Sequence, residues 1–238
     1  MAYPLMKQFS KILQKLFIKK IEGIENIPSY GPFIVVANHQ SHLDGFLLAG
    51  YVVQKTDQPI HFLAKREFTS YFGSWIENLV YKKWANCILI EKEGTPNKGK
   101  DAIAQAARTL EEDGIVGIFP EGTRTYDGSL QQGRTGVVRI LLEVQKEIKK
   151  NIPLIPVGIH GANIMLPRKA IIPRIWKSEI SFKVGKPFYI KTININKKKT
   201  KSKKKINSGY SITKAMLRKQ TTMIMKKIAA CAGEKYDP

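Results

Sequence analysis

A histidine and an aspartate five residues apart are the first residues of this sequence whose types and spacing could do chemistry. His39 and Asp44 lie in the polar segment 38–44, between the apolar run 33–37, which predicts a buried strand, and 45–49, which predicts the start of a helix. Open α/β sheets bind ligands at the carboxyl ends of strands. The pair offers a general base and a carboxylate to orient it. It therefore indicates direct transfer of a group onto a substrate hydroxyl, without a serine or cysteine nucleophile.

Asp44 also has a structural interpretation. Residues Ser41 to Asp44 match a capping pattern, in which the carboxylate would satisfy backbone N–H groups at a helix start. In the catalytic interpretation, the carboxylate bonds one imidazole nitrogen and leaves the other nitrogen as the base. The spacing alone favours neither interpretation. The remaining histidines, His42, His61 and His160, are predicted to be structural or surface residues.

A second polar loop follows the apolar run 115–119, which also predicts a strand. The loop carries the sequence Pro-Glu-Gly-Thr-Arg at 120–124. Gly122 would let the backbone approach a ligand closely, and Arg124 offers a planar set of donors for phosphate. The alternative is a solvent-facing turn whose arginine forms a salt bridge.

A third motif, at 94–100, matches the phosphate-loop pattern G-x-x-x-x-G-K. The next residue is Asp101, where that pattern needs Ser or Thr to bind magnesium, and its carboxylate would face the phosphates. We therefore interpret this segment as a strand-to-helix connection. Cys87 and Cys231 show no metal-ligand spacing and form no disulfide framework, so we predict no metal site and favour a reducing compartment.

The order of the predicted elements favours a layered α/β fold. The 238 residues are 43% hydrophobic, enough for one globular domain with appendages rather than a disordered chain. Strands alternate with helices, which predicts a layered mixed, largely parallel sheet flanked by helices. The strands are predicted at 33–37, 60–64, 87–91, 115–119, 154–159 and 179–184, and the helices between them at 45–54, 100–113 and 137–150.

The net charge of +21 gathers at the two ends of the chain. Residues 1–20 hold five lysines and 191–227 hold thirteen basic residues, both without an acid, so the rest carries only +3. Residues 4–20 predict a basic amphipathic helix that can lie in a membrane interface, with packing on the domain as the alternative. Residues 191–209 predict a solvated lysine-rich loop, and 210–230 a final helix.

Four short blocks, in this order along the chain, resemble the glycerolipid acyltransferase family. They are the N-H-x4-D block at 38–44, the block 62–68, the F-P-E-G-T-R block at 119–124 and the proline-containing block 152–159. They span roughly residues 33–160 and are most similar to the lysophosphatidic acid acyltransferase type, 1-acyl-sn-glycerol-3-phosphate O-acyltransferase.

The resemblance implies a role for each matched residue. His39 would be the catalytic base and Asp44 its partner. The acceptor's glycerol phosphate would be bound by four residues of one block, with Arg124 on the phosphate and Lys65 as a second basic contact. Those four residues are Glu121, Gly122, Thr123 and Arg124. Pro153 and Pro156 would shape the acyl-donor site.

The chain departs from the family pattern at two places. Glu91-Lys92 stands where the family often shows Asp-Arg, so Lys92 would be a weaker phosphate contact. The segment 131–134, Gln-Gln-Gly-Arg, is less basic than the usual Lys-Lys-Gly, which leaves the role of that loop open.

The resemblance also implies a reaction. The enzyme would transfer a fatty acyl group from acyl-CoA or acyl-ACP to the free hydroxyl of 1-acyl-glycerol-3-phosphate, giving phosphatidic acid without an acyl-enzyme. Glycerol-3-phosphate or another lysolipid is the alternative acceptor. No metal or cofactor is expected beyond the acyl thioester itself, which is a co-substrate.

We therefore predict three parts of the chain. They are a basic amphipathic membrane-contact helix at 1–20, an acyltransferase catalytic domain at 21–190, and a lysine-rich loop with a basic helix at 191–238. No apolar run of about 18 residues predicts a transmembrane span, and the N-terminus does not resemble a signal peptide. A peripheral or monotopic position on the cytoplasmic face of an anionic membrane is expected. A nucleic-acid-binding protein is the rival class, but the basic tail lacks interleaved aromatic residues to stack on bases.

Overall fold

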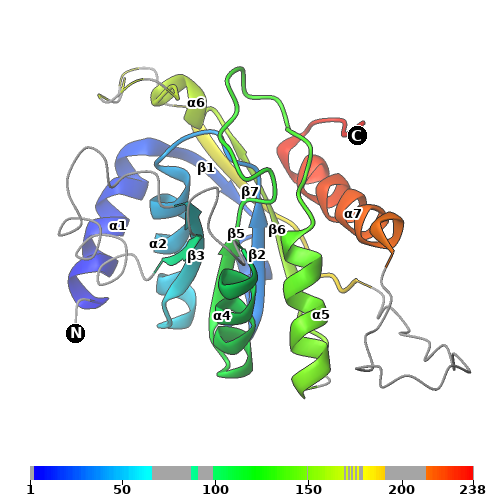
Figure 1. Ribbon diagram of the computed structural model, residues 1–238. Helices are drawn as coiled ribbons and strands as arrows, with labels where there is room; N and C mark the ends of the chain where they lie inside the picture. Colours follow the sequence, from blue (N-terminus) through cyan, green and yellow to red (C-terminus); the bar gives the residue numbers. More distant parts are fainter. Residues whose placement is uncertain are drawn as a thin grey trace, which may run out of the picture.

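A seven-stranded sheet forms the centre of the computed structural model (Figure 1), which describes residues 3–65, 87–90, 99–148, 150–168, 170, 172, 174, 176, 179–190 and 213–237. The strands lie in the order β1-β7-β6-β2-β5-β3-β4, and among these described strands β6 and β7 pair antiparallel while the other neighbours are parallel. The predicted layered, largely parallel sheet is therefore confirmed. The strands are β1 (Ile18–Glu22), β2 (Phe33–Ala37), β3 (Ile60–Lys65), β4 (Ile88–Ile90), β5 (Ile115–Ile118), β6 (Leu154–His160) and β7 (Ile180–Val184).

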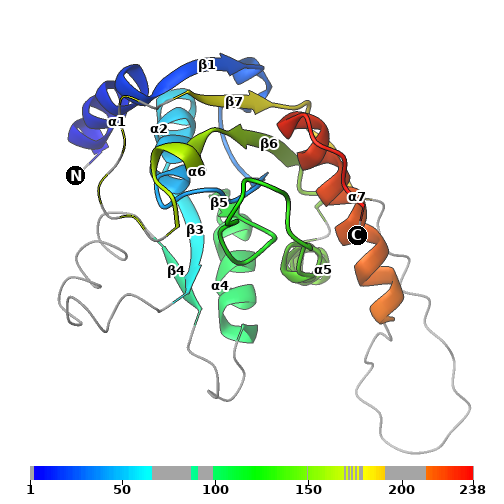
Figure 2. The same ribbon diagram turned by 90° about the horizontal axis from the view of Figure 1, so that it is seen from above.

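Helices cover both faces of the sheet, as the view from above shows (Figure 2). On one face lie α1 (Tyr3–Phe17) and α2 (Asp44–Thr56), and on the other lie α4 (Lys100–Glu111), α5 (Gly136–Ile148) and α7 (Lys214–Ala232). Two short helices, η1 (Ile24–Asn26) and α6 (Ala162–Met165), lie in connections. Alternate residues of β2 point into the two cores, and all five are buried. This double burial explains why the strand is a continuous apolar run.

The N-terminal helix ends earlier than the periodicity predicts. Residues 18–22 leave the helix and pair with β7 as a parallel edge strand, so tertiary pairing overrides the local helical pattern. Within α1, Gln14 is buried and donates to the Leu47 carbonyl of α2 over 3.3 Å, while Ile12 and Leu16 are exposed. Contact of this helix with a membrane stays a prediction. Within the described residues no helix is long and apolar enough to cross a membrane.

The C-terminal helix packs directly on the sheet. It begins at Lys214, where the Thr213 hydroxyl accepts the Met216 N–H, a few residues later than predicted. Its apolar residues join the core beside α4 and α5. At Gly158 of β6 an added Cβ would lie 2.2 Å from the backbone of Cys231, so glycine permits this approach. The lysine-rich segment 191–209 lies outside the described residues, and the predicted division into three parts is left untested.

Candidate active site

The carboxyl ends of β2 and β5 place the two polar loops side by side (Figure 1). The strands are parallel neighbours in which Val36 pairs with Ile118. Residues three positions beyond each of these, His39 and Glu121, therefore emerge at the same edge of the sheet. On the other side of β2, Asn38 ties the start of the His39 loop to β6. Its side-chain amide exchanges two hydrogen bonds of 2.7 and 2.8 Å with the backbone of Ile159.

His39 and Asp44 lie within hydrogen-bond distance. Nδ1 of His39 is 2.9 Å from Oδ2 of Asp44, and the same oxygen accepts the backbone N–H groups of Gln40 and Ser41, each over 2.7 Å. Asp44 therefore satisfies backbone donors and bonds the imidazole at once. The donors belong to the loop before α2, which differs from a simple helix cap.

The surroundings of His39 fix its orientation. Since Asp44 Oδ2 is an acceptor for two peptide N–H groups, Nδ1 of His39 carries the proton it donates, and Nε2 is left as an acceptor. The imidazole stacks on the Phe119 ring at 4.1 Å between centroids. Asp44 is wholly buried, whereas a fifth of the His39 side chain is exposed. A base that is oriented from one side and exposed on the other suits proton abstraction from a substrate hydroxyl.

Glu121 holds the backbone of both loops. Its Oε1 accepts the peptide N–H of His39 over 2.8 Å, and its Oε2 accepts that of Gln131 over 2.7 Å. The side chain is 2% exposed. Burial raises its pKa to about 7, partly offset by those two hydrogen bonds, while the charges of Asp44 and Glu234 raise the pKa further. The resemblance implied a substrate contact for Glu121. The sequence signal for its support of the loops is a glutamate placed directly after a buried strand.

The C-terminal residues hold the loop that Gln131 belongs to. The Glu234 carboxylate accepts the Leu130 N–H over 3.1 Å, and the Tyr236 hydroxyl accepts the Gly133 N–H over 3.2 Å. Arg218 of α7 donates to the Gly133 carbonyl over 2.7 Å. This contact between distant segments had no signal in the sequence.

Three arginines lie within or beside the loop 120–124. Arg124 donates to the Arg168 carbonyl over 3.1 Å, and Arg168 donates to the Arg124 carbonyl over 3.0 Å. Gly122 has φ of +66°, and an added Cβ there would lie 2.9 Å from Nε of Arg134. The Arg134 side chain therefore crosses this glycine. Arg134 and Arg168 were not predicted as site residues, and together with Arg124 they give the loop a cationic rim suited to an anionic group.

The other expected contacts are placed only in part. Lys65 ends β3, which is parallel to β5, so its backbone reaches the same edge of the sheet; its side chain lies outside the described part. Thr123 is half-buried within the loop. Pro156 lies within β6 opposite Val36. Residues 66–68 and Lys92, and most of the motif at 94–100, fall outside the described residues.

His42 adds a third ionisable group near the pair. Loss of surrounding water, followed by the charges of Arg124 and His39, lowers the pKa of His42 to about 4. The side chain is therefore neutral near pH 7. His42 is exposed, which agrees with its prediction as a structural or surface residue, and its closeness to Arg124 had no signal in the sequence.

Known proteins resemble this chain in sequence and in fold. A family model described as Acyltransferase matches residues 19–160. The chain is similar to 1-acyl-sn-glycerol-3-phosphate acyltransferase alpha of Mus musculus, with 30% identity over 140 residues, 58% of this chain and 44% of that protein. It is also similar to the 1-acyl-sn-glycerol-3-phosphate acyltransferase of Bacillus subtilis, with 27% identity over 143 residues, 60% of this chain and 62% of that protein. The chain thus spans about half the length of these relatives.

One solved structure shares the fold over the whole chain. It is the crystal structure of the 1-acyl-sn-glycerophosphate (LPA) acyltransferase, PlsC, from Thermotoga maritima. The TM-score is 0.63 at 22% identity, and the match covers 100% of this chain and 82% of that one. At this identity the likeness shows the fold.

Proposed function

Because this chain belongs to the Acyltransferase family, we propose that it transfers a fatty acyl group from an acyl thioester to the free hydroxyl of 1-acyl-glycerol-3-phosphate, giving phosphatidic acid. The names of its relatives support this acceptor. The observation that carries the proposal is the 2.9 Å contact between His39 Nδ1 and Asp44 Oδ2 at the open end of two parallel strands.

His39 is the proposed general base. Its Nε2 takes the proton of the acceptor hydroxyl as the hydroxyl oxygen attacks the thioester carbonyl, and Asp44 stabilises the imidazolium that forms. The tetrahedral oxyanion then collapses, the carbon–sulfur bond breaks, and the imidazolium returns the proton to the departing thiolate. One ester and one thiol are formed, no acyl-enzyme is required, and neither a metal nor a cofactor takes part.

The cationic rim is the proposed phosphate site. Arg124 is the proposed phosphate ligand, and Arg134 and Arg168 add positive charge on either side of it. Lys65 is proposed as a further basic contact, with Gly122 and Thr123 along the glycerol. The role of Glu121 is to hold the loop. It does not bind the phosphate, because a carboxylate would repel the phosphate.

The lipid nature of acceptor and product requires access to a bilayer. We therefore propose a peripheral position on an anionic membrane surface, supported by the +21 net charge and by the exposed Ile12 and Leu16 of α1.

A panel assay tests the reaction. The full chain would be offered 1-acyl-glycerol-3-phosphate, glycerol-3-phosphate and a neutral lysolipid, each with acyl-CoA and with acyl carrier protein as donor. We expect the first acceptor to give the highest kcat/KM, and the donor giving the higher value identifies the donor class. Absence of acyl transfer to every acceptor would contradict the proposal, and a clear preference for glycerol-3-phosphate would change the acceptor.

A further inference from the structure

The connection between β6 and β7, residues 161–179, carries three exposed apolar side chains among its described residues; we call it the site-edge segment. Ile172 and Trp176 are 79% and 77% exposed, and Ile164 is 49% exposed. Between Pro167 and Ser178 the sequence holds four basic residues and no acidic one. Large apolar side chains exposed on one short connection, unlike single scattered ones, indicate an interaction surface.

The site-edge segment lies at the same end of the sheet as His39. It leaves the carboxyl end of β6, which is parallel to β2, and its first helix is tied to the His39 loop because the Ala162 N–H donates to Oε1 of Gln40 over 3.2 Å. Arg168 joins it to the second loop through Arg124 and lies 4.2 Å above the ring centroid of the exposed Tyr126. A surface contacting this segment would therefore meet the rim of the candidate site.

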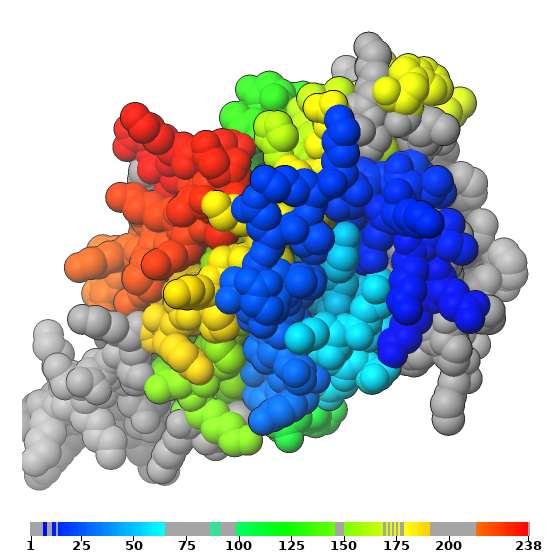
Figure 3. Space-filling view, turned by 180° about the vertical axis from the view of Figure 1, so that it is seen from behind, coloured from blue at the N-terminus to red at the C-terminus, as the bar shows by residue number. Residues whose placement is uncertain are grey.

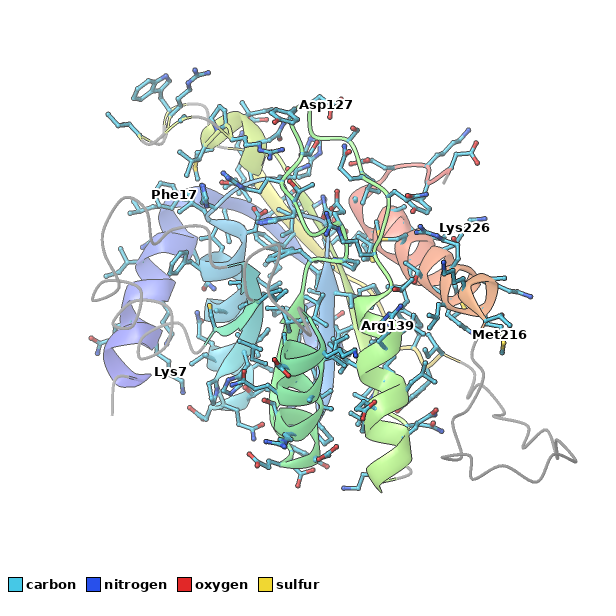
Figure 4. All side chains as sticks on the ribbon, in the orientation of Figure 1. Lys7, Phe17, Asp127, Arg139, Met216 and Lys226 are labelled. Carbon is cyan, nitrogen blue, oxygen red and sulfur yellow. The ribbon has the colours of Figure 1, made fainter. Side chains whose placement is uncertain are left out.

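The site-edge segment also meets the carboxyl end of α1. Glu179 forms an ion pair with Lys19, and Ile180 pairs with Ile18 of β1. In Figure 3 the described residues of the segment stand at the top of the molecule above α1, and in Figure 4 α1 rises from Lys7 to Phe17 toward the end where Asp127 lies. Leu16 of α1 is 66% exposed and lies two residues before Ile18 in the chain.

We propose that the site-edge segment, with the end of α1 beside it, is the surface on which this protein docks to an anionic lipid bilayer. Trp176 enters the interfacial layer, where amphipathic aromatic rings are enriched, Ile172 reaches the boundary with the acyl chains, and Arg174 and Arg168 face the lipid phosphates. The absence of acidic residues between Pro167 and Ser178 favours a negatively charged occupant over a second copy of this chain, whose net charge is +21. The inference rests on the proposed function, because docking here brings the lipid acceptor to the end of the sheet where His39 lies.

The experiment compares two matched double variants of the full chain. Ile172→Ser with Trp176→Ser removes the apolar part of the proposed surface. Tyr30→Ser with Tyr189→Ser removes two aromatic side chains of similar exposure, 76% and 58%, at the opposite end of the sheet. Tyr30 precedes β2, and Tyr189 follows the bridge between Leu154 and Phe188 at the start of β6.

Co-sedimentation with vesicles of phosphatidylcholine and phosphatidylglycerol in equal parts measures the affinity. We expect the first double variant to bind roughly tenfold more weakly than the wild type, in line with the loss of two interfacial apolar side chains, and the second to bind like the wild type. Equal binding of the two double variants, or a wild-type chain that ignores the vesicles, would overturn the proposal. A dimer of the wild type that is lost only in the first variant would overturn it in favour of self-association.

Trp176→Phe gives a readout that does not depend on a large loss of apolar surface. Brominated phosphatidylcholine in the same vesicles should quench the wild-type tryptophan fluorescence more than that of Trp176→Phe, and equal quenching would contradict insertion of Trp176. Acyl transfer to a short-chain acceptor dissolved as monomers should be the same in both double variants. If the wild type lacked that activity, the proposed function would be contradicted. The vesicle measurements would still test the docking surface independently.

Discussion

The peptide N–H of His39 donates to Oε1 of Glu121 over 2.8 Å, so a buried carboxylate at the end of β5 fixes the backbone of the candidate base at the end of β2. The second oxygen of Glu121 accepts the N–H of Gln131. Both oxygens are thus used by peptide groups of two loops. Asp44 orients the His39 ring, and Glu121 positions the backbone that carries the ring. The site therefore depends on two carboxylates with different roles.

Glu121→Gln should lower kcat by about tenfold or more while the chain stays folded. An amide offers one acceptor and one donor, so its NH2 would face the N–H of His39 or of Gln131, and one buried N–H would lose its partner at about 1–3 kcal/mol. Steady-state kinetics with 1-acyl-glycerol-3-phosphate and circular dichroism measure the two effects. Glu112→Gln, at an exposed position after α4, is the matched control and should behave like the wild type. An unchanged kcat in Glu121→Gln would remove the positioning role.

The contribution of Glu121 to the unfolding free energy should fall as the pH rises from about 4.5 to about 7, against an opposite contribution from His42, whose pKa is lowered to about 4. Burial raises the pKa of this carboxyl from 4.5 to about 7, so the folded chain holds a proton that the unfolded chain releases in that interval. The contribution is fully present below about pH 4.5 and is lost as the pH passes about 7. It amounts to at most about 1.4 kcal/mol for each pH unit between the folded-state and unfolded-state pKa of Glu121.

Urea unfolding across this pH interval tests that linkage. Glu121→Gln lacks the titrating group, so the stability difference between wild type and variant should shift against the wild type as the pH rises. A difference that stays constant from about pH 4.5 to about pH 7 would show that the carboxyl does not titrate there.

Asp44→Asn and Asp44→Ala should differ in stability. Oδ1 of Asp44 is buried and has no hydrogen-bond partner among the described residues, so an asparagine can put its NH2 there and keep its oxygen toward His39, Gln40 and Ser41. We expect Asp44→Asn to fold nearly as well as the wild type but to lose kcat by about tenfold or more, because the imidazolium loses its countercharge.

Asp44→Ala should lose both properties. Its truncation leaves the N–H groups of Gln40 and Ser41 buried without their acceptor, at about 1–3 kcal/mol each. Denaturation midpoints and kcat of the two variants, measured side by side, separate support of the loop from chemistry. Equal stability of the two variants would mean that this oxygen does not support the loop.

Much of the fold followed from sequence periodicity, whereas the loop contacts did not. The continuous apolar run of β2 and the alternation of strands with helices predicted a parallel sheet, and parallel neighbours bring His39 and Glu121 to one edge. The hydrogen bonds that Tyr236 and Glu234 accept from the loop around Gln131 span more than a hundred residues, and no local pattern encodes them. The end of α1 was misplaced for the same reason, because pairing with β7 decides it.

Tyr236→Phe should destabilise the loop that Glu121 holds. The variant keeps the ring but removes the hydroxyl that accepts the Gly133 N–H, which corresponds to about 1 kcal/mol of unfolding free energy. Proteolysis within the 125–134 loop should become faster, and kcat should fall a few-fold. Tyr189→Phe, an exposed tyrosine at the other end of the sheet, is the control. Equal proteolysis rates in the two variants would count against this contact.

The central claim is that His39 removes the proton of the acceptor hydroxyl, and the turnover of His39→Ala tests it most directly. His160→Ala, at the exposed end of β6, is the histidine control. With saturating 1-acyl-glycerol-3-phosphate and acyl donor, we predict that His39→Ala loses at least about a hundredfold in kcat, as expected for loss of a general base, while His160→Ala keeps wild-type turnover. A kcat of His39→Ala close to that of the wild type would contradict the mechanism.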